Sequence, residues 1–286
     1  MDEALEQQNY GERLLEGSLT LDSAEAFEAI LEKVPEDRLL VKAYADFLAG
    51  KESFAPAARH YRKAGELFGA AGMVLHAVSA KVLEWKAAKP SRRECRLLYA
   101  AIREVRSEKP LNDFFCHMTY SELVSVLSRL DSVRLPADAA IKHSGDPEDF
   151  LYFIVSGRVA ETIPPQAGGE AEIRREYAAQ SAEANYFGDI YPFDEQRVSP
   201  SQFKTVAACE LLKISRANLA DLCEAYPNVK ILLIRLTKAH RLYAQKDGTR
   251  KFRKSVRFHL QTQIDLKIFG SDPNRGPLVL KGSVQD

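Results

Sequence analysis

The chain has 286 residues, more than one typical domain, and we expect two or three folded regions. Its composition, 45% hydrophobic and 28% charged, is that of a globular protein and excludes a wholly disordered or fibrous chain. Forty basic and forty acidic residues cancel, so any attraction to a polyanion must be local. The first ten residues are acidic and no run of about 18 apolar residues occurs, which predicts a cytoplasmic protein without membrane insertion.

The residues that usually carry metal or catalytic chemistry form no recognisable motif. The four cysteines and six histidines give no CxxC, HxxxH or HExxH spacing, so we expect no metal site. The chain also has no P-loop and no GxSxG sequence, and acidic residues such as Glu161 are interpreted as surface or turn positions. These absences predict a protein that is not an enzyme.

Residues 1–105 follow a helical pattern, with apolar residues three and four positions apart. The predicted breaks are Pro35, Gly50, Gly72 and Pro90. In residues 54–67, small alanines such as Ala64 lie between the larger Phe54, Tyr61 and Leu67, as closely packed antiparallel helices require. This segment resembles a tetratricopeptide repeat and implies binding of a partner protein. A generic helical cap on the next domain is the alternative.

Residues 110–245 change to a mixture of helices and short strands. An amphipathic helix is predicted over 114–130, and a capping box from Thr119 to Glu122 signals its start. Alternating apolar residues predict strands at 133–135, 151–155, 158–163 and 205–214. Two helices are expected to close this region, one from a Ser215 cap to residue 225 and one over residues 228–245, after Pro227.

Three motifs in this region point to one family. They are SGDPEDFLYFIVSGRV at 144–159, FGDI at 187–190 and CELLKISR at 209–216. Their order and spacing resemble the cyclic-nucleotide-binding domain. The resemblance implies an antiparallel β jelly roll with flanking helices and a ligand such as cyclic AMP or cyclic GMP. With the helical region before it, the predicted fold class of the chain is α+β.

The resemblance also indicates where a nucleotide would bind. In the family, backbone N–H groups after a Phe-Gly-Glu turn meet the cyclic phosphate, the glutamate binds the ribose, and an arginine pairs with the phosphate. Here Asp189 takes the glutamate position. Counting back from Val206 gives the arginine position to Gln202, whose amide cannot form the charged pair, and Arg197 is a candidate replacement. The candidate nucleotide-binding residues are Gly188, Asp189, Ile190, Arg197, Gln202, Phe203 and Thr205.

The last region, residues 246–286, begins in a basic stretch. Residues 235–257 contain nine Lys or Arg and one acidic residue. Arg253 and Arg257 form an RxxxR motif followed by two alternating segments, which resembles the start of a PilZ domain, the bacterial cyclic di-GMP receptor module. The resemblance implies that both arginines contact cyclic di-GMP. Asp286 would begin the second motif of that family.

Together these patterns predict a bacterial, non-enzymatic signalling protein in which a cyclic-nucleotide-binding-like domain is coupled to a PilZ-like segment. The alternative is a ligand-independent scaffold that binds partner proteins through its helical repeats. A DNA-binding regulator is disfavoured, because no helix-turn-helix follows the long helix. That helix, residues 228–245, is the candidate surface for a homodimer.

Overall fold

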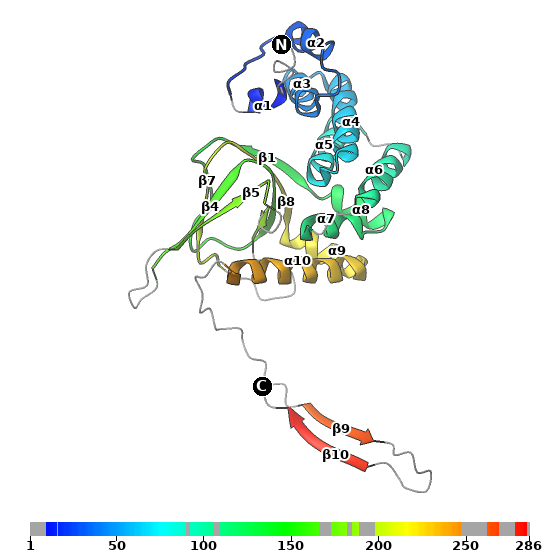
Figure 1. The fold of residues 1–286 in the computed structure, drawn as a ribbon, viewed down its shortest axis with the longest axis vertical. Helices are drawn as coiled ribbons and strands as arrows, with labels where there is room; N and C mark the ends of the chain where they lie inside the picture. Colours follow the sequence, from blue (N-terminus) through cyan, green and yellow to red (C-terminus); the bar gives the residue numbers. More distant parts are fainter. Residues whose placement is uncertain are drawn as a thin grey trace, which may run out of the picture. The chain divides into compact units, whose positions relative to one another are not determined.

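The computed structural model describes residues 10–15, 17–89, 92–105, 109–165, 173–181, 185–188, 198–246, 262–268 and 278–284. The chain divides into two compact units, Met1–Lys246 and Asp247–Asp286. The predicted helical and jelly-roll regions therefore lie together in the first unit (Figure 1).

Short helices build the first part of this unit. They are α1 (Tyr10–Leu15), α2 (Ala24–Leu31), α3 (Arg38–Gly50), α4 (Phe54–Ala70), α5 (Val74–Ala87) and α6 (Arg92–Glu104). The side chain of Asp37 caps α3 by accepting hydrogen bonds from the backbone N–H groups of Leu39 and Leu40. Helix α4 packs against both α3 and α5, and its Ala57 and Ala64 are fully buried. The helix pairing is as the alanine spacing predicts, and the assignment to tetratricopeptide repeats stays a prediction.

The predicted continuous helix over residues 114–130 is wrong. Two helices occupy this stretch, α7 (Pro110–Cys116) and α8 (Tyr120–Leu127). Thr119 has an extended backbone, with φ −70° and ψ 166°, and caps α8 in a reciprocal box with Glu122. The capping box is therefore confirmed, and it marks a helix start inside the predicted helix.

Two antiparallel four-stranded sheets form the β-sandwich. One has the order β1-β8-β3-β6 and the other β2-β7-β4-β5. The strands are β1 (Asp131–Leu135), β2 (Ala140–Lys142), β3 (Phe150–Ser156), β4 (Arg158–Ile163), β5 (Ile173–Ala178), β6 (Tyr186–Phe187), β7 (Gln202–Thr205) and β8 (Cys209–Ser215). The predicted single strand over 205–214 is two strands, because β7 and β8 belong to different sheets. The mixed class of helices and antiparallel sheets is confirmed.

Two helices complete the unit, α9 (Arg216–Ala225) and α10 (Pro227–Lys246). Ser215 caps α9 as predicted. One continuous apolar core contains residues of helices α5, α6, α7 and α8, of strands β3 and β8, and of helices α9 and α10. Within it the ring of Phe153 lies 5.8 Å from that of Phe115. The helices thus cover the outer face of the β3–β8 sheet rather than forming a separate body.

A group of polar and charged side chains, of which Lys42, Ser79 and Glu210 are buried, also joins the helices to the sandwich. Lys42 on α3 donates to Glu210 on β8 at 2.6 Å, and Ser79 on α5 donates to the same carboxylate. Arg134 on β1 pairs with Asp46 on α3 at 2.5 Å. We call Lys42, Asp46, Ser79, Arg134 and Glu210 the junction cluster.

The second unit contains β9 (Thr262–Ile268) and β10 (Leu278–Val284), paired antiparallel over their full lengths. Two strands were predicted here, and the PilZ barrel stays a prediction. In the described parts of the chain, no helix has the length and apolar character needed to cross a bilayer.

Candidate nucleotide site in the β-sandwich

The sandwich interior is lined by alternate residues of its strands, because successive side chains in a strand point to opposite faces. On β7, Phe203 and Thr205 are buried, whereas Gln202 is half-buried and Lys204 is exposed. Phe203 packs in the interior core. Gln202 therefore lies on the outer face of its sheet, and its amide points away from the interior.

Aromatic rings fill the centre of this interior. Phe187 on β6 lies between Tyr152 and Phe203, stacked on each at a centroid distance of 4.8 Å. Tyr177 on β5 lies 6.0 Å from both Phe187 and Phe203. These rings, with Ile154 and other apolar residues of both sheets, form a small core of their own.

Two buried ion pairs flank the rings. Glu161 on β4 lies 3.4 Å from Arg175 on β5, and the two residues are direct cross-strand neighbours. Lys142 on β2 pairs with Glu148 at 2.5 Å, and its ammonium lies 4.6 Å from the centre of the Phe203 ring. The interior is thus polar as well as aromatic, with two positive and two negative side chains.

Glu161 has further donors besides Arg175. The hydroxyls of Tyr177 and Ser201 each donate to its carboxylate at 2.8 Å. Burial and the nearby Glu161 charge raise the pKa of Tyr177, so its hydroxyl remains protonated and able to donate. The interpretation of Glu161 as a surface or turn residue is wrong, since its exposed fraction is 7%. Its in-phase spacing with Val159 and Ile163 along β4 is the signal that predicts an inward side chain.

Thr205, a predicted site residue, is engaged with the backbone. Its hydroxyl donates to the carbonyl of Pro136 at 2.7 Å and accepts from the N–H of Ala139 at 2.8 Å. These bonds fix the turn between β1 and β2 against β7. In this arrangement the Thr205 hydroxyl has a structural role.

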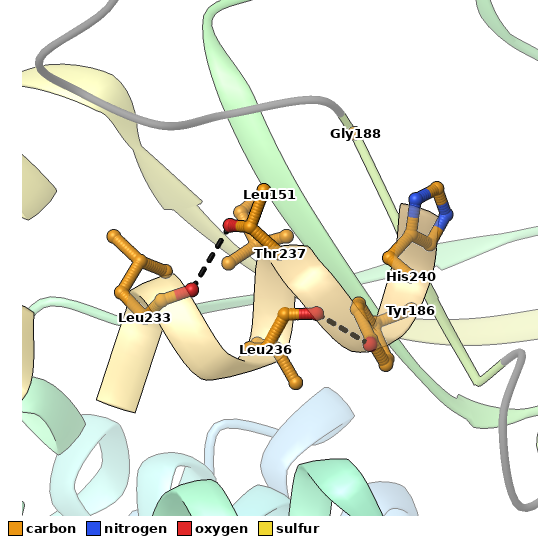
Figure 2. Close-up of a pocket in the computed structure, with 7 residues that line it drawn as sticks. All are labelled: Leu151, Tyr186, Gly188, Leu233, Leu236, Thr237 and His240. Carbon is orange, nitrogen blue, oxygen red and sulfur yellow. Dashed lines mark hydrogen bonds between the residues drawn. The ribbon is translucent and has the colours of Figure 1, made fainter. Parts of the chain in front are cut away.

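Gly188 ends β6 with a backbone conformation that only glycine adopts readily. Its φ is 100°, and a Cβ atom there would lie 2.6 Å from the carbonyl oxygen of Phe150. A pocket with about 10 Å³ of free space adjoins it, enough for roughly one water molecule. Figure 2 shows its lining residues, which are Leu151, Tyr186, Gly188, Leu233, Leu236, Thr237 and His240.

Helix α10 forms one wall of this pocket. The Tyr186 hydroxyl donates to the carbonyl of Leu236 on α10 at 2.8 Å (Figure 2). The His240 ring stacks on Tyr177 with centroids 6.0 Å apart and lies 5.4 Å from the ring of Tyr186. The helix therefore contacts both the Gly188 pocket and the inner face of β5.

The remaining predicted site residues lie outside the described residues. They are Asp189, Ile190 and Arg197 for the nucleotide, and Arg253, Arg257 and Asp286 for cyclic di-GMP. The structure thus brings Phe203 and Thr205 to one interior, with Gly188 directly after β6 of the facing sheet. Across the described parts of the chain, no group of three or more His, Cys, Asp or Glu could hold a metal ion.

Residues 132–226 match the family model of the cyclic nucleotide-binding domain. This part of the chain is a cyclic nucleotide-binding domain. Among similar proteins is the cAMP-activated global transcriptional regulator CRP. The Pasteurella multocida protein is 24% identical over 103 residues, covering 36% of this chain and 47% of the relative. The Haemophilus influenzae protein is 27% identical over 100 residues, covering 35% and 42%.

The match therefore spans about half the length of these relatives. Two solved structures are similar to about half of this chain. The Thermus thermophilus Catabolite Activator Protein has a TM-score of 0.38 at 24% identity, covering 47% of this chain and 60% of that one. The sensor domain of the transcriptional regulator DNR from Pseudomonas aeruginosa has a TM-score of 0.37 at 18% identity, covering 51% and 95%.

Proposed function

We propose that the chain is a non-enzymatic regulatory protein in which residues 110–245 sense a cyclic nucleotide. The family match over residues 132–226 carries this proposal. Cyclic AMP is the first candidate ligand, because the CRP relatives are named as cAMP-activated. Gly188 supports the position of the site, since its positive φ allows the close backbone approach that phosphate binding at a turn requires.

We propose that α10 transmits the effect of ligand binding to the rest of the chain. His240 and Leu236 on this helix contact Tyr177 and Tyr186, so a ligand that moves either tyrosine shifts the balance between two positions of α10. The chain continues from Lys246 into the basic stretch that holds Arg253 and Arg257. Coupling to a PilZ-like segment that binds cyclic di-GMP is the further part of this proposal.

Calorimetric titration of the full chain with cyclic AMP, cyclic GMP and cyclic di-GMP tests the proposal. We expect saturable heat with at least one of the two mononucleotides. Truncation of the chain after Lys246 should leave that binding intact and abolish any binding of cyclic di-GMP. Absence of heat with both mononucleotides, for a chain shown to be folded by circular dichroism, would reject the sensor function.

One observation favours a second function, that of a ligand-independent scaffold. The ring of Phe187 stacks on those of Tyr152 and Phe203 at centroid distances of 4.8 Å, and the buried charges beside them pair with one another. A domain packed in this way holds its fold without a ligand. The same titration separates the two functions, because a scaffold binds none of the nucleotides and its melting temperature does not change when they are added.

A further inference from the structure

Arg175 is a buried cation with an incomplete set of partners. Its exposed fraction is 9%, and its Nε–H has no hydrogen-bond acceptor. Its guanidinium is within hydrogen-bonding range of the Tyr177 hydroxyl, and its Nη1 lies 3.4 Å from Glu161. A charge-assisted N–H···O bond is normally about 2.7 to 2.9 Å long, so this contact is weak. A buried guanidinium that lacks acceptors is costly to the protein unless a further acceptor completes it.

The carboxylate of Glu161, by contrast, has hydrogen-bond donors other than Arg175. The hydroxyls of Tyr177 and Ser201 already donate to its carboxylate at 2.8 Å each. An incoming anion could therefore draw the guanidinium away and leave Glu161 hydrogen-bonded. The other interior cation has less freedom, because Lys142 pairs with Glu148 at 2.5 Å.

Arg175 is connected to the Gly188 pocket through Tyr177 and His240. Tyr177, two residues further along the same face of β5, stacks on His240, and His240 lines that pocket. A ligand bound beside Gly188 that extended past Tyr177 along the inner face of β5 would meet the guanidinium next. Arginine suits such a role because its planar fork can donate two parallel hydrogen bonds to one phosphate.

We propose that Arg175 supplies the charged contact to the phosphodiester of the bound nucleotide. This inference rests on the proposed sensor function. In this proposal the cation of the site lies on β5 and not in the segment that leads into β7. On binding, the guanidinium exchanges its long contact with Glu161 for the phosphate oxygens.

The test compares three single variants by titration of the full chain with cyclic AMP. Arg175→Gln should weaken binding by roughly 10- to 100-fold, the effect of one charged hydrogen bond. Arg174→Gln is the matched control, because Arg174 is the exposed neighbour on the same strand, and its affinity should equal that of the wild type. Glu161→Gln removes the carboxylate that competes for the guanidinium and should tighten binding several-fold.

A second ligand separates a contact to the phosphate from a general loss of the site. Adenosine lacks the phosphate, so its affinity, measured by competition with a fluorescent cyclic nucleotide, should be the same in the wild type and Arg175→Gln. Should Arg175→Gln fail to fold, Arg175→Lys keeps the charge but not the fork and should still lose several-fold in affinity.

The outcomes distinguish this inference from the function on which it rests. If the wild type binds cyclic AMP and Arg175→Gln binds it equally well, Arg175 is not the phosphate contact and the sensor function stands. An equal loss of cyclic AMP and adenosine binding would also overturn the inference. If the wild type binds neither cyclic AMP nor cyclic GMP, both the function and the inference fail.

Discussion

Gly188 and Gly145 both have positive φ angles, 100° and 91°, but different surroundings. A Cβ on Gly188 would meet the Phe150 carbonyl at 2.6 Å, whereas nothing lies within 4 Å of a Cβ on Gly145. Gly188→Ala should therefore lower the free energy of unfolding by roughly 2 to 3 kcal/mol, and Gly145→Ala by about 1 kcal/mol. Denaturant unfolding of the two variants measures the difference. Equal losses would show that the backbone at Gly188 can move away from β3.

Substitution of Gln202 tests which residue makes the charged contact to the phosphate. Its side chain lies on the outer face of β7, opposite Thr162 in the register. Gln202→Arg should leave the affinity for cyclic AMP unchanged, because the new guanidinium would point away from the interior. Calorimetric titration checks this, with Gln202→Lys as a second charged variant. A gain of tenfold or more in the arginine variant would place the phosphate contact at position 202 instead.

At the scale of elements, Glu210 holds two helices to a strand. Lys42 lies 2.6 Å and Arg134 3.6 Å from its carboxylate. Burial alone would raise the pKa of Glu210, but Lys42 and Arg134 together lower it to about 2. Glu210→Gln should reduce stability by roughly 3 kcal/mol at neutral pH, because Lys42 loses its closest charge. Thermal unfolding gives the measurement.

The same residue should make stability depend on pH. Its carboxylate has a lower pKa in the folded chain than the usual 4.5, so its contribution is complete above pH 4.5 and is lost as the pH falls toward 2. The Glu210→Gln variant should lose that part of the pH dependence. Asp138→Asn is the control, because the ion pair of Asp138 with Lys204 is exposed and contributes little. Parallel pH profiles for wild type and Glu210→Gln would contradict this role.

Elements with a strong local signal could be predicted from the sequence. Ser215 and Thr119 cap helices where they were expected to, and β3 and β4 follow their apolar alternation. The break between α7 and α8 was missed because apolar spacing continues across it. The change of sheet between β7 and β8 was missed for the same reason.

The interior of the site was harder to predict than its strands. Phe203 was predicted as a site residue and lies in the sandwich interior, where Arg175 and Ser201, which were not predicted, also lie. The pairing of Arg175 with Glu161 depends on the register between β4 and β5, which local patterns do not fix. Gln202 was placed by counting along a motif, and a shift of one residue in a strand turns a side chain to the opposite face.

At the scale of the whole molecule, the compact unit contains more residues than the family match covers. The match covers residues 132–226, whereas the compact unit extends from Met1 to Lys246. The difference consists largely of helices that share the apolar core of β3 and β8. Because protein interiors are close-packed, a shift in β3 or β8 would be transmitted to these helices, α10 included.

The junction cluster has a practical consequence for anyone who wishes to isolate the sandwich. Cutting the chain before Pro110 would remove Lys42 and Ser79, and Glu210 would keep only Arg134 among its described partners. The same cut would remove the residues that α4, α5 and α6 contribute to the shared apolar core. A protein shortened to its recognisable family core would therefore be prone to aggregate, and crystallographers should start from the longer piece that ends at Lys246.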